Sequence, residues 1–590
     1  MNLISDLQTE ISSAISSIFS IEVPLDDITL QNTNPEFDGE LTLVVFQLLK
    51  HVKGNPAKIG EQIGEHLKDQ STIVEDFNVV KGFLNLSISH AIWIHEFNQI
   101  NNSYWNLPDN EQTVVLEYCG PNTNKPLHLG HVRNMLIGWS LAEILQKAGN
   151  TVHKVNIYND RGIAICKSMV AWKLFGEGET PESTGMKGDH FVGLYYVKYA
   201  AVEAEQAQQY LDQGVEKREA VKQTEINQLA QKTLQKWEAG DQETLALWQE
   251  MNSWVYKGFN KTYDNIGVDF ERDYLESNTY QLGKRIVTEG VENGVFYKKE
   301  DDSVWVDLED VGLDQKLLLR GDGTSVYITQ DIGTAQLRYD DYNMNRSIYV
   351  VGNEQDYHFQ VLKQILLKLK KPFADGIQHL SYGMVDLPTG KMKSREGKVV
   401  DADDLIDEML FTANEITEEL GKVDGFSQAE KETLYKQVGL GALKFFILRV
   451  DPKKRMLFDP QESIDFQGFT GPFVQYTHAR IQSVLKKANE EISATIPTTL
   501  TLQEQELNLI QQVLSYQEML SAAATKLDHS IVAKYAFDTA KLFNQFYAHL
   551  PISKEEDEQL RIFRLQLSKR VGEAIKNSLS LLGIESPQRM

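Results

Sequence analysis

The sequence predicts an α/β protein built around a parallel sheet and extended by mainly helical parts. One observation is a set of apolar runs between turn residues, VVLEY at 114–118, TVHKVNIY at 151–158 and SIYVVG at 347–352, which are typical of buried strands. Another is a helix of about a dozen residues between the first two runs, which Gly149 closes. Strand, helix and strand in this order form the repeating unit of a parallel sheet.

The composition indicates a multidomain protein of ordinary globular type. The 590 residues exceed what one hydrophobic core usually supports, and 42% of them are hydrophobic. A net charge of -25 argues against a uniformly basic nucleic-acid surface, although it is compatible with a local one. Cys119 and Cys166 are too few for a disulfide framework or a thiolate zinc site and fit a reducing compartment. Because no apolar run reaches the length of a membrane span, we predict a cytoplasmic protein.

Changes in pattern along the chain suggest where its parts begin and end. Strand-like runs such as LTLVVFQLL (41–49) and VVKGFLNLSIS (79–89) alternate with helical patterns before a polar, turn-rich segment. The predicted parts are a small α+β domain (1–105), a catalytic domain (106–400) with a helical insertion at about 177–260, a helical connecting region (401–464) and an all-helical carboxyl-terminal domain (465–590).

The stretch CGPNTNKPLHLGHVRN, residues 119–134, joins the first predicted strand to its helix. Unpaired N–H groups and the positive end of the dipole favour an anion at a helix start. His128 and His131, three residues apart, share one face of the first turn, and Gly130 leaves room for a flat base. These features suit a triphosphate with its purine, while a four-residue motif also fits histidines that only cap or pack the helix.

Two stretches resemble the signature motifs of class I aminoacyl-tRNA synthetases. GPNTNKPLHLGH (120–131) resembles the HIGH motif, and MVDLPTGKMKSREGKVV (384–400) resembles the KMSKS loop. The resemblance implies a Rossmann-like catalytic domain that binds ATP with Mg²⁺ and needs no zinc. Attack of a carboxylate on the α-phosphate develops negative charge, which donors and cations would stabilise. By resemblance, the ATP-binding residues are His128, Gly130, His131, Met392, Lys393 and Ser394.

The second motif departs from the family pattern at one lysine. The loop reads KMKSR, so the position of the second lysine holds Ser394, between Lys393 and Arg395. We hypothesise that Lys125, three residues before His128, supplies the missing charge, and Lys393 and Arg395 remain alternatives. The expected catalytic residues are therefore His128, His131, Lys125, Lys393 and Arg395.

Four stretches together resemble the arginyl-tRNA synthetases over nearly the whole chain. They are LEYCGPNTNKPLHLGHVRN (116–134), SVYITQDIGTA (325–335), YVVGNEQDYHFQ (349–360) and DFQGFTGPFVQYTHARI (465–481). The resemblance implies ATP-dependent ligation of L-arginine to tRNA(Arg) through an arginyl-adenylate. Two alternatives remain open, a noncatalytic tRNA-binding paralogue and another HIGH-type adenylating ligase.

A pocket selective for arginine should offer carboxylates and a flat or hydroxyl-bearing neighbour to the planar guanidinium. Glu117 ends the first predicted strand, and Asp331 follows Tyr327 by four residues, so that a helical turn would bring both to one side. The resemblance assigns the guanidinium end to Glu117, Tyr327 and Asp331, and the α-amino and carboxylate end to Asn122, Gln355 and His128.

The carboxyl-terminal region resembles the DALR anticodon-binding domain of the same family. Phe473, Tyr476 and Arg480 are groups of the kind that stack on bases, although packing within the domain explains them equally well. The first hundred residues would be the additional domain that contacts the outer corner of the tRNA. The expected partners are tRNA(Arg), L-arginine and ATP, without a membrane, and we expect a monomer.

Overall fold

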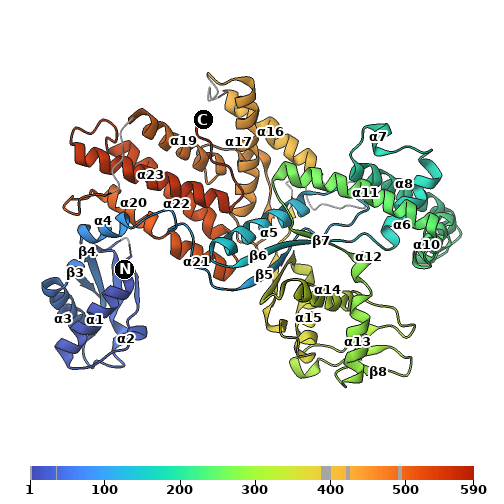
Figure 1. The fold of residues 1–590 in the computed structure, drawn as a ribbon, viewed down its shortest axis with the longest axis horizontal. Coiled ribbons are helices and arrows are strands. Elements are labelled where there is room, and N and C mark those ends of the chain that lie inside the picture. The colour runs from blue at the N-terminus through green and yellow to red at the C-terminus, as the bar shows by residue number, and fades with distance from the viewer. Residues whose placement is uncertain (1–2, 35, 387–399, 420–424, 489–494) are drawn as a thin grey trace. The chain divides into compact units, whose positions relative to one another are not determined.

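The computed structural model describes residues 3–34, 36–386, 400–419, 425–488 and 495–590 (Figure 1). The chain forms two compact units that do not follow its order. One contains Met1–Tyr104, Ile481–Tyr516 and Lys541–Ala574, and the other contains Trp105–Arg480, Gln517–Ala540 and Ile575–Met590. None of the helices within the described ranges is long and apolar enough to cross a membrane.

The second unit is built on a parallel sheet, as the sequence predicted, and the sheet has five strands. The strand order is β12-β11-β5-β6-β7, and every neighbouring pair is parallel. From the neighbouring strands β5 and β11, successive strands along the chain are added in opposite directions, which makes this pair a topological switch point. Such α/β sheets bind ligands beyond the carboxyl ends of the strands at the switch point. The strands are β5 (Thr113–Glu117), β6 (Thr151–Tyr158), β7 (Arg272–Leu275), β11 (Arg346–Gly352) and β12 (Ile377–Tyr382).

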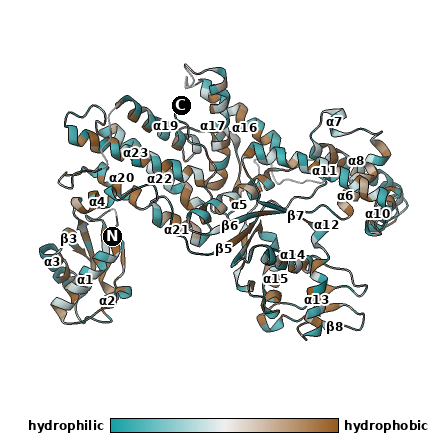
Figure 2. Cartoon of the chain, in the orientation of Figure 1, coloured by the Kyte–Doolittle hydropathy of each residue, from teal (hydrophilic) through white to brown (hydrophobic). Residues whose placement is uncertain are grey.

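Helices α5 (Leu129–Lys147) and α14 (Tyr327–Tyr342) lie on opposite faces of this sheet (Figure 1). The apolar colour of β5 in Figure 2 fits a strand that is covered on both faces. The prediction of about a dozen residues for α5 was too short, because the helix has 19 and begins inside the HIGH-like motif. Gly138 brings this helix close to the sheet, since a Cβ there would lie only 2.3 Å from the Cβ of Tyr118.

Six helices separate β6 from β7, which confirms the predicted helical insertion. The helices extend beyond both ends of the range 177–260, and the last of them ends at Gly267, whose positive φ of 72° favours glycine. They are α6 (Ile163–Phe175), α7 (Pro181–Thr184), α8 (Gly188–Leu211), α9 (Lys217–Gln223), α10 (Glu225–Glu238) and α11 (Gln242–Ile266).

A small antiparallel sheet, with strand order β10-β9-β8, lies between α13 and α14 in the chain and was not predicted from the sequence. Its strands have two to four residues, too few for an alternating pattern to stand out. The remaining elements here are α12 (Glu276–Thr279), α13 (Leu282–Glu292), β8 (Tyr297–Lys298), β9 (Val304–Val306), β10 (Lys316–Leu319), α15 (Asp356–Lys368), β13 (Val385–Asp386), α16 (Ala402–Glu419), α17 (Gln428–Leu448), β14 (Met456–Leu457) and α18 (Pro460–Ser463).

The amino-terminal residues form the predicted α+β arrangement, with an antiparallel sheet in the order β1-β2-β4-β3. The run 41–49 is only partly a strand, because it changes to a helix at Val45, whereas the run 79–89 contains a turn at Lys81 and Gly82 between two strands. The elements are α1 (Leu3–Phe19), β1 (Leu30–Asn32), β2 (Leu41–Val44), α2 (Val45–Leu48), α3 (Pro56–Gln70), β3 (Val74–Val80), β4 (Phe83–Ile88) and α4 (His90–Asn98).

The carboxyl-terminal part is helical, as predicted. Arg564 of its last helix forms an ion pair with Glu506, which lies in α20, and both side chains are buried. The helices are α19 (Gly471–Ala488), α20 (Glu504–Leu514), α21 (Tyr516–Lys526), α22 (Ser530–His549) and α23 (Glu558–Leu581).

Candidate active site

A cavity of about 660 Å³ opens at the carboxyl ends of β5 and β11, at the switch point of the parallel sheet. Of the residues predicted for catalysis, ATP binding or arginine binding that the structure describes, Asn122 and Lys125 do not line it. Met392, Lys393, Ser394 and Arg395 lie outside the described residues. The cavity brings together seven predicted residues, namely Glu117, His128, Gly130, His131, Tyr327, Asp331 and Gln355.

His128 and His131 both cap α5 and line the cavity, so the two readings of this motif are compatible. The Nδ1 atom of His128 accepts a hydrogen bond of 3.1 Å from the backbone N–H of Gly130, and His131 Nδ1 accepts one of 3.2 Å from the backbone N–H of His128. A Cβ at Gly130 would lie 3.0 Å from the His128 ring. Any larger residue would therefore push the His128 ring away from its position over the first turn by a few tenths of an ångström.

Both imidazole rings are neutral near pH 7. Burial, helped by the charge of Lys125, lowers the pKa of His128 to about 4. Burial also holds the pKa of His131 well below its usual value. Because Nδ1 is the acceptor in each ring, the single proton lies on Nε2. The rings, with centroids 3.9 Å apart, thus give the site two Nε2–H donors without a formal charge.

Glu117 already has an internal guanidinium partner. Its Oε2 atom pairs with Nη2 of Arg338, a fully buried side chain of α14. The Arg338 guanidinium also lies 5.1 Å from the ring centre of Tyr274 and 5.4 Å from that of Tyr349. The assignment of Glu117 to a substrate guanidinium stays a prediction, and this ion pair gives its carboxylate a structural role that the sequence did not indicate.

The acidic end of the cavity contains Asp331, Tyr327 and Glu276. Tyr327 and Asp331 lie one turn apart on α14, as their spacing predicted, and the tyrosine is 79% exposed. Asp331 Oδ2 lies 2.5 Å from Nε2 of His358. Sequence reasoning missed Glu276, whose pKa is raised by burial against the opposing charge of Arg161. Its position directly after β7, where a parallel strand ends at the ligand edge, was the available signal.

Buried Asp160 holds the segment that carries Glu276. Its carboxylate accepts hydrogen bonds from the backbone N–H (2.9 Å) and the hydroxyl (2.7 Å) of Ser277, and from the hydroxyl of Tyr256 at 3.2 Å. Its carbonyl oxygen accepts one of 2.6 Å from Trp248 Nε1. Because Trp248 and Tyr256 belong to α11, the insertion helps to position the acidic end of the cavity.

The three residues predicted to contact RNA lie on α19 and are half-buried. The ring of Phe473 packs 5.2 Å from that of Phe537, and the Arg480 guanidinium lies 4.9 Å from the ring centre of Tyr476. Packing therefore accounts for the position of Phe473, and contact with RNA stays a prediction for all three.

The cavity and sheet are of the kind found in class I aminoacyl-tRNA synthetases, and comparison with known families agrees. Residues 98–459 match the catalytic domain of "tRNA synthetases class I (R)". Residues 474–590 match the DALR anticodon binding domain, and residues 5–88 match the arginyl tRNA synthetase N-terminal domain.

Similar proteins extend over the full length of the chain. An arginine–tRNA ligase of Amoebophilus asiaticus is 52% identical and covers 100% of both chains, and one of Parabacteroides distasonis is 52% identical over 98% of both. The arginyl-tRNA synthetase structure of Thermus thermophilus has the same fold, with a TM-score of 0.82 at 23% identity over 100% of both chains. The chain belongs to the arginine–tRNA ligase family.

The low pKa of His128 predicts a specific dependence of stability on pH. A histidine in an unfolded chain has a pKa of about 6.5, whereas burial lowers the pKa of folded His128 to about 4. The contribution of His128 to the free energy of unfolding is therefore fully present above the pKa of the unfolded state. It is lost as the pH falls through the pKa of the folded state. His128→Asn keeps a capping oxygen but does not titrate. We expect the difference in melting temperature between wild type and variant to shrink from pH 7.5 to pH 5, and a constant difference would contradict this.

The pair of Glu117 and Arg338 predicts a large stability effect. Arg338→Met leaves a largely buried carboxylate without its partner, which should lower the free energy of unfolding by about 3 kcal/mol. Adding Glu117→Gln should restore part of the loss, because an amide costs less to bury than a charge. Thermal unfolding measures both effects. The control is Arg285→Met, which removes an exposed ion pair with Glu289 and should change stability by less than about 0.5 kcal/mol. Equal loss of stability in Arg338→Met and Arg285→Met would refute the stabilising role of the Glu117–Arg338 pair.

Proposed function

We propose that this protein joins L-arginine to tRNA(Arg) in an ATP-dependent reaction that passes through an arginyl-adenylate. The observation that carries the proposal is the division of the cavity into two ends. Two imidazole donors lie at the start of α5, where an anion is favoured, and two carboxylates lie opposite, on α14 and α12. A nucleoside triphosphate fits the end with the imidazole donors, and a guanidinium fits the end with the carboxylates.

The amino acid is proposed to bind with its side chain at the acidic end. Asp331 and Glu276 would accept hydrogen bonds from the guanidinium, with the Tyr327 ring or hydroxyl beside it. Gln355 and His128 line the same cavity and would hold the α-amino and carboxylate groups. Asn122 would take part through Asn159, its neighbour in an isolated parallel bridge, which lines the cavity.

The proposed reaction has two steps. A carboxylate oxygen of arginine attacks the α-phosphorus of ATP, the bond from that phosphorus to the bridging oxygen breaks, and diphosphate leaves. A hydroxyl of the terminal tRNA ribose then attacks the arginyl carbonyl carbon, the bond from that carbon to the phosphate oxygen breaks, and AMP leaves as the hydroxyl proton passes to its phosphate or to solvent. The Nε2–H groups of His128 and His131 would donate hydrogen bonds to the phosphate oxygens as charge develops there.

Magnesium is proposed to enter with the nucleotide. Among the described residues, the one cluster of three potential metal ligands is Asp189, His190 and Asp403, and none of these lines the cavity. When bound to ATP, Mg²⁺ would neutralise phosphate charge.

The positive charge at the phosphates is proposed to come from Lys125. Its charge contributes to the lowered pKa of both His128 and His131, so its field reaches the start of α5. Lys393 and Arg395 remain alternatives. For the RNA, Tyr476 and Arg480 on α19 offer an aromatic face and a cation. We further propose that the enzyme acts as a monomer in the cytoplasm.

Removing the charge of Asp331 should weaken arginine binding selectively. We expect Asp331→Asn to lower kcat/KM for arginine by about 100-fold, because a charge-assisted pair is replaced by a neutral contact, while KM for ATP stays unchanged. Steady-state arginylation of a tRNA(Arg) transcript measures both constants. Asp340→Asn, at an exposed position of the same helix, is the matched control. Full activity of Asp331→Asn would exclude this residue from the guanidinium site, and no charging of tRNA by the wild type would exclude the proposed function.

Loss of Lys125 should slow the first step. We expect Lys125→Ala to reduce ATP–diphosphate exchange, measured with arginine and tRNA(Arg) present, by about 10-fold or more, since one cation at the phosphates is removed. Lys232→Ala, on the exposed face of α10, should leave the exchange rate unchanged. An exchange rate near that of the wild type in Lys125→Ala would remove this lysine from the mechanism.

A further inference from the structure

A short segment, Val400–Asp403, pairs with the turn that holds His128. The backbone N–H of Leu129 donates a hydrogen bond of 3.1 Å to the carbonyl oxygen of Val400, and that of Ala402 donates one of 3.0 Å to the carbonyl oxygen of Leu127. His128 and Asp401 form the antiparallel bridge between these two bonds. The backbone at the start of α5 is therefore held on one side by this segment.

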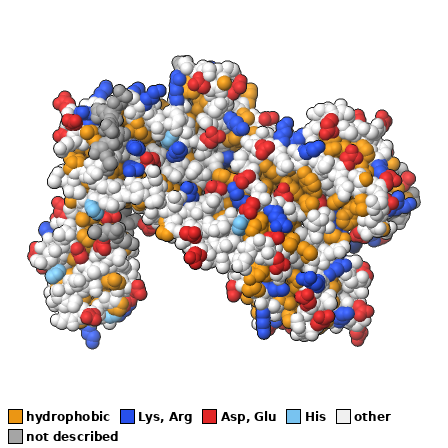
Figure 3. All heavy atoms as spheres, in the orientation of Figure 1, with side chains coloured by type: hydrophobic (Ala, Val, Ile, Leu, Met, Phe, Trp, Pro, Cys, Tyr) orange, Lys and Arg blue, Asp and Glu red, His pale blue; other side chains and the backbone are white. Residues whose placement is uncertain are grey.

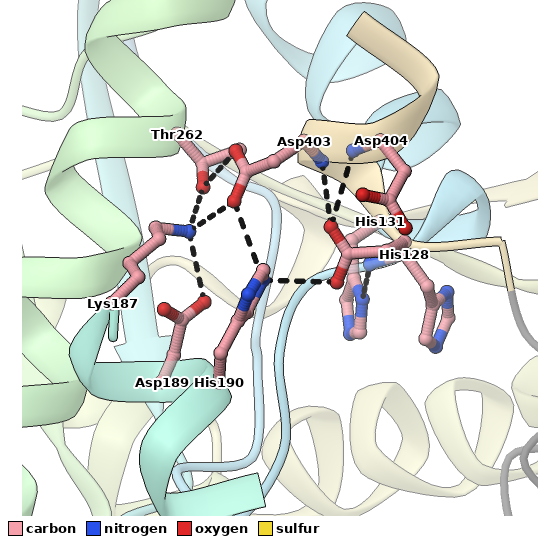
Figure 4. Close-up of polar contacts among 9 residues, drawn as sticks. His128, His131, Lys187, Asp189, His190, Thr262, Asp403 and Asp404 are labelled. Carbon is pink, nitrogen blue, oxygen red and sulfur yellow. Dashed lines mark hydrogen bonds and ion pairs between the residues drawn. The ribbon is translucent and has the colours of Figure 1, made fainter. Parts of the chain in front are cut away.

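Side chains from the helical insertion hold the segment in turn (Figure 4). His190 Nε2 lies 3.0 Å from Asp401 Oδ2 and 3.4 Å from Asp403 Oδ2. Lys187 Nζ lies 2.5 Å from Asp403 Oδ2, and the hydroxyl of Thr262 donates a hydrogen bond of 3.0 Å to Asp403 Oδ1. His190 belongs to α8, Lys187 precedes it, and Thr262 belongs to α11. The contacts thus run from the insertion to the residues beside His128.

These contacts are ionic at neutral pH. The carboxylates of Asp401 and Asp403 raise the pKa of His190 to about 10 against the effect of burial, so the ring is an imidazolium. The pKa of Asp403 is strongly lowered by His190 and Lys187, which outweigh burial. Asp401 has a second role, because its Oδ1 accepts a hydrogen bond of 2.8 Å from the N–H of Asp403 and caps α16. The position of the segment therefore depends on two cations of the insertion.

The same cluster does not favour a metal ion. Donor atoms of Asp189, His190 and Asp403 lie within 4.8 Å of one another. However, the Lys187 ammonium lies 2.5 Å from Asp403 Oδ2 and 3.0 Å from Asp189 Oδ2. A cation already joins the two carboxylates, and a divalent ion beside it would be repelled.

We propose that His190, assisted by Lys187, is a positioning residue for the nucleotide end of the active site. By holding Asp401 and Asp403, it fixes Val400–Asp403 against the start of α5 and thereby the orientation of His128. This inference rests on the proposed function, because ATP is the ligand that His128 would contact. It gives the insertion a role at the ATP end of the cavity, separate from the role of Asp160 at the arginine end.

The test compares KM for ATP and for arginine in His190→Gln. The variant removes the charge, and we expect KM for ATP in tRNA arginylation to rise about fivefold, a typical size for the coupling between contacting groups, while KM for arginine stays unchanged. His190→Lys, which restores a positive charge, should recover part of the ATP affinity. The matched control is Lys173→Met, which breaks the Lys173–Glu243 pair of 2.6 Å elsewhere in the insertion and should change neither constant.

A double-mutant cycle with Asp401→Asn tests whether His190 acts through this carboxylate. Asparagine caps a helix as well as aspartate does, so the variant keeps the cap of α16 and loses only the charge. We expect the double variant to have the same KM for ATP as either single one. Additive effects of the two substitutions on KM for ATP would overturn the inference. So would an equal rise of KM for ATP and KM for arginine in His190→Gln, or a KM for ATP in His190→Gln that equals that of the wild type.

Two further measurements keep the outcomes distinct. If the wild type charges tRNA(Arg) with arginine while His190→Gln retains the wild-type KM for ATP, the inference fails and the proposed function stands. If the wild type charges no tRNA, the proposed function fails. Should His190→Gln not fold, Thr262→Val removes a hydrogen bond to the same Asp403 with a side chain of the same shape. We then expect a smaller but selective rise in KM for ATP, and an unchanged value would count against the inference.

Discussion

The buried ion pair between Glu117 and Arg338 is the interaction on which the cavity depends. It joins the carboxyl end of β5 to α14, two turns from Asp331, and so fixes the acidic face of the site relative to the sheet. An ion pair in such surroundings demands good geometry, because each charge has lost its water. Glu117, placed at the strand end where a ligand would be expected, is neutralised by the protein itself. Glu276 and Asp331, the latter paired with His358, are then the carboxylates that we propose to receive a cationic side chain.

The cavity separates two kinds of electrostatic environment. At the start of α5, the histidines are neutral donors, because burial and the charge of Lys125 lower their pKa values. At the other end, the carboxylates favour a cation. Local arrangement rather than total charge produces this contrast, since Figure 3 shows acidic and basic side chains interspersed on the visible face and the chain carries a net charge of -25. In the proposed function, this contrast helps to orient a substrate that has an anionic and a cationic part.

Much of the framework could be predicted from the sequence, because the relevant signals are local. The strands β5, β6 and β11 are apolar runs between turns, and Tyr327 and Asp331 have helical spacing. The roles of Arg338 and Asp160 could not be predicted in this way. Arg338 meets Glu117 across 221 residues of chain, and Asp160 meets Ser277 across 117. Such contacts depend on the tertiary fold, which also explains why the position of Glu276 in the cavity was missed. The two-residue strands β8, β13 and β14 are too short for any sequence pattern.

In the proposed site, carboxylates at the α14 end recognise the charge of a guanidinium and not only its shape. Isothermal titration of the protein with L-arginine and with L-citrulline separates the effect of charge from that of shape, because citrulline has nearly the same shape and a neutral ureido group. We expect citrulline to bind at least about 100-fold more weakly than arginine, since two acidic groups would be left without a cation. Equal affinity for the two amino acids would show that the carboxylates do not recognise the charge of the guanidinium.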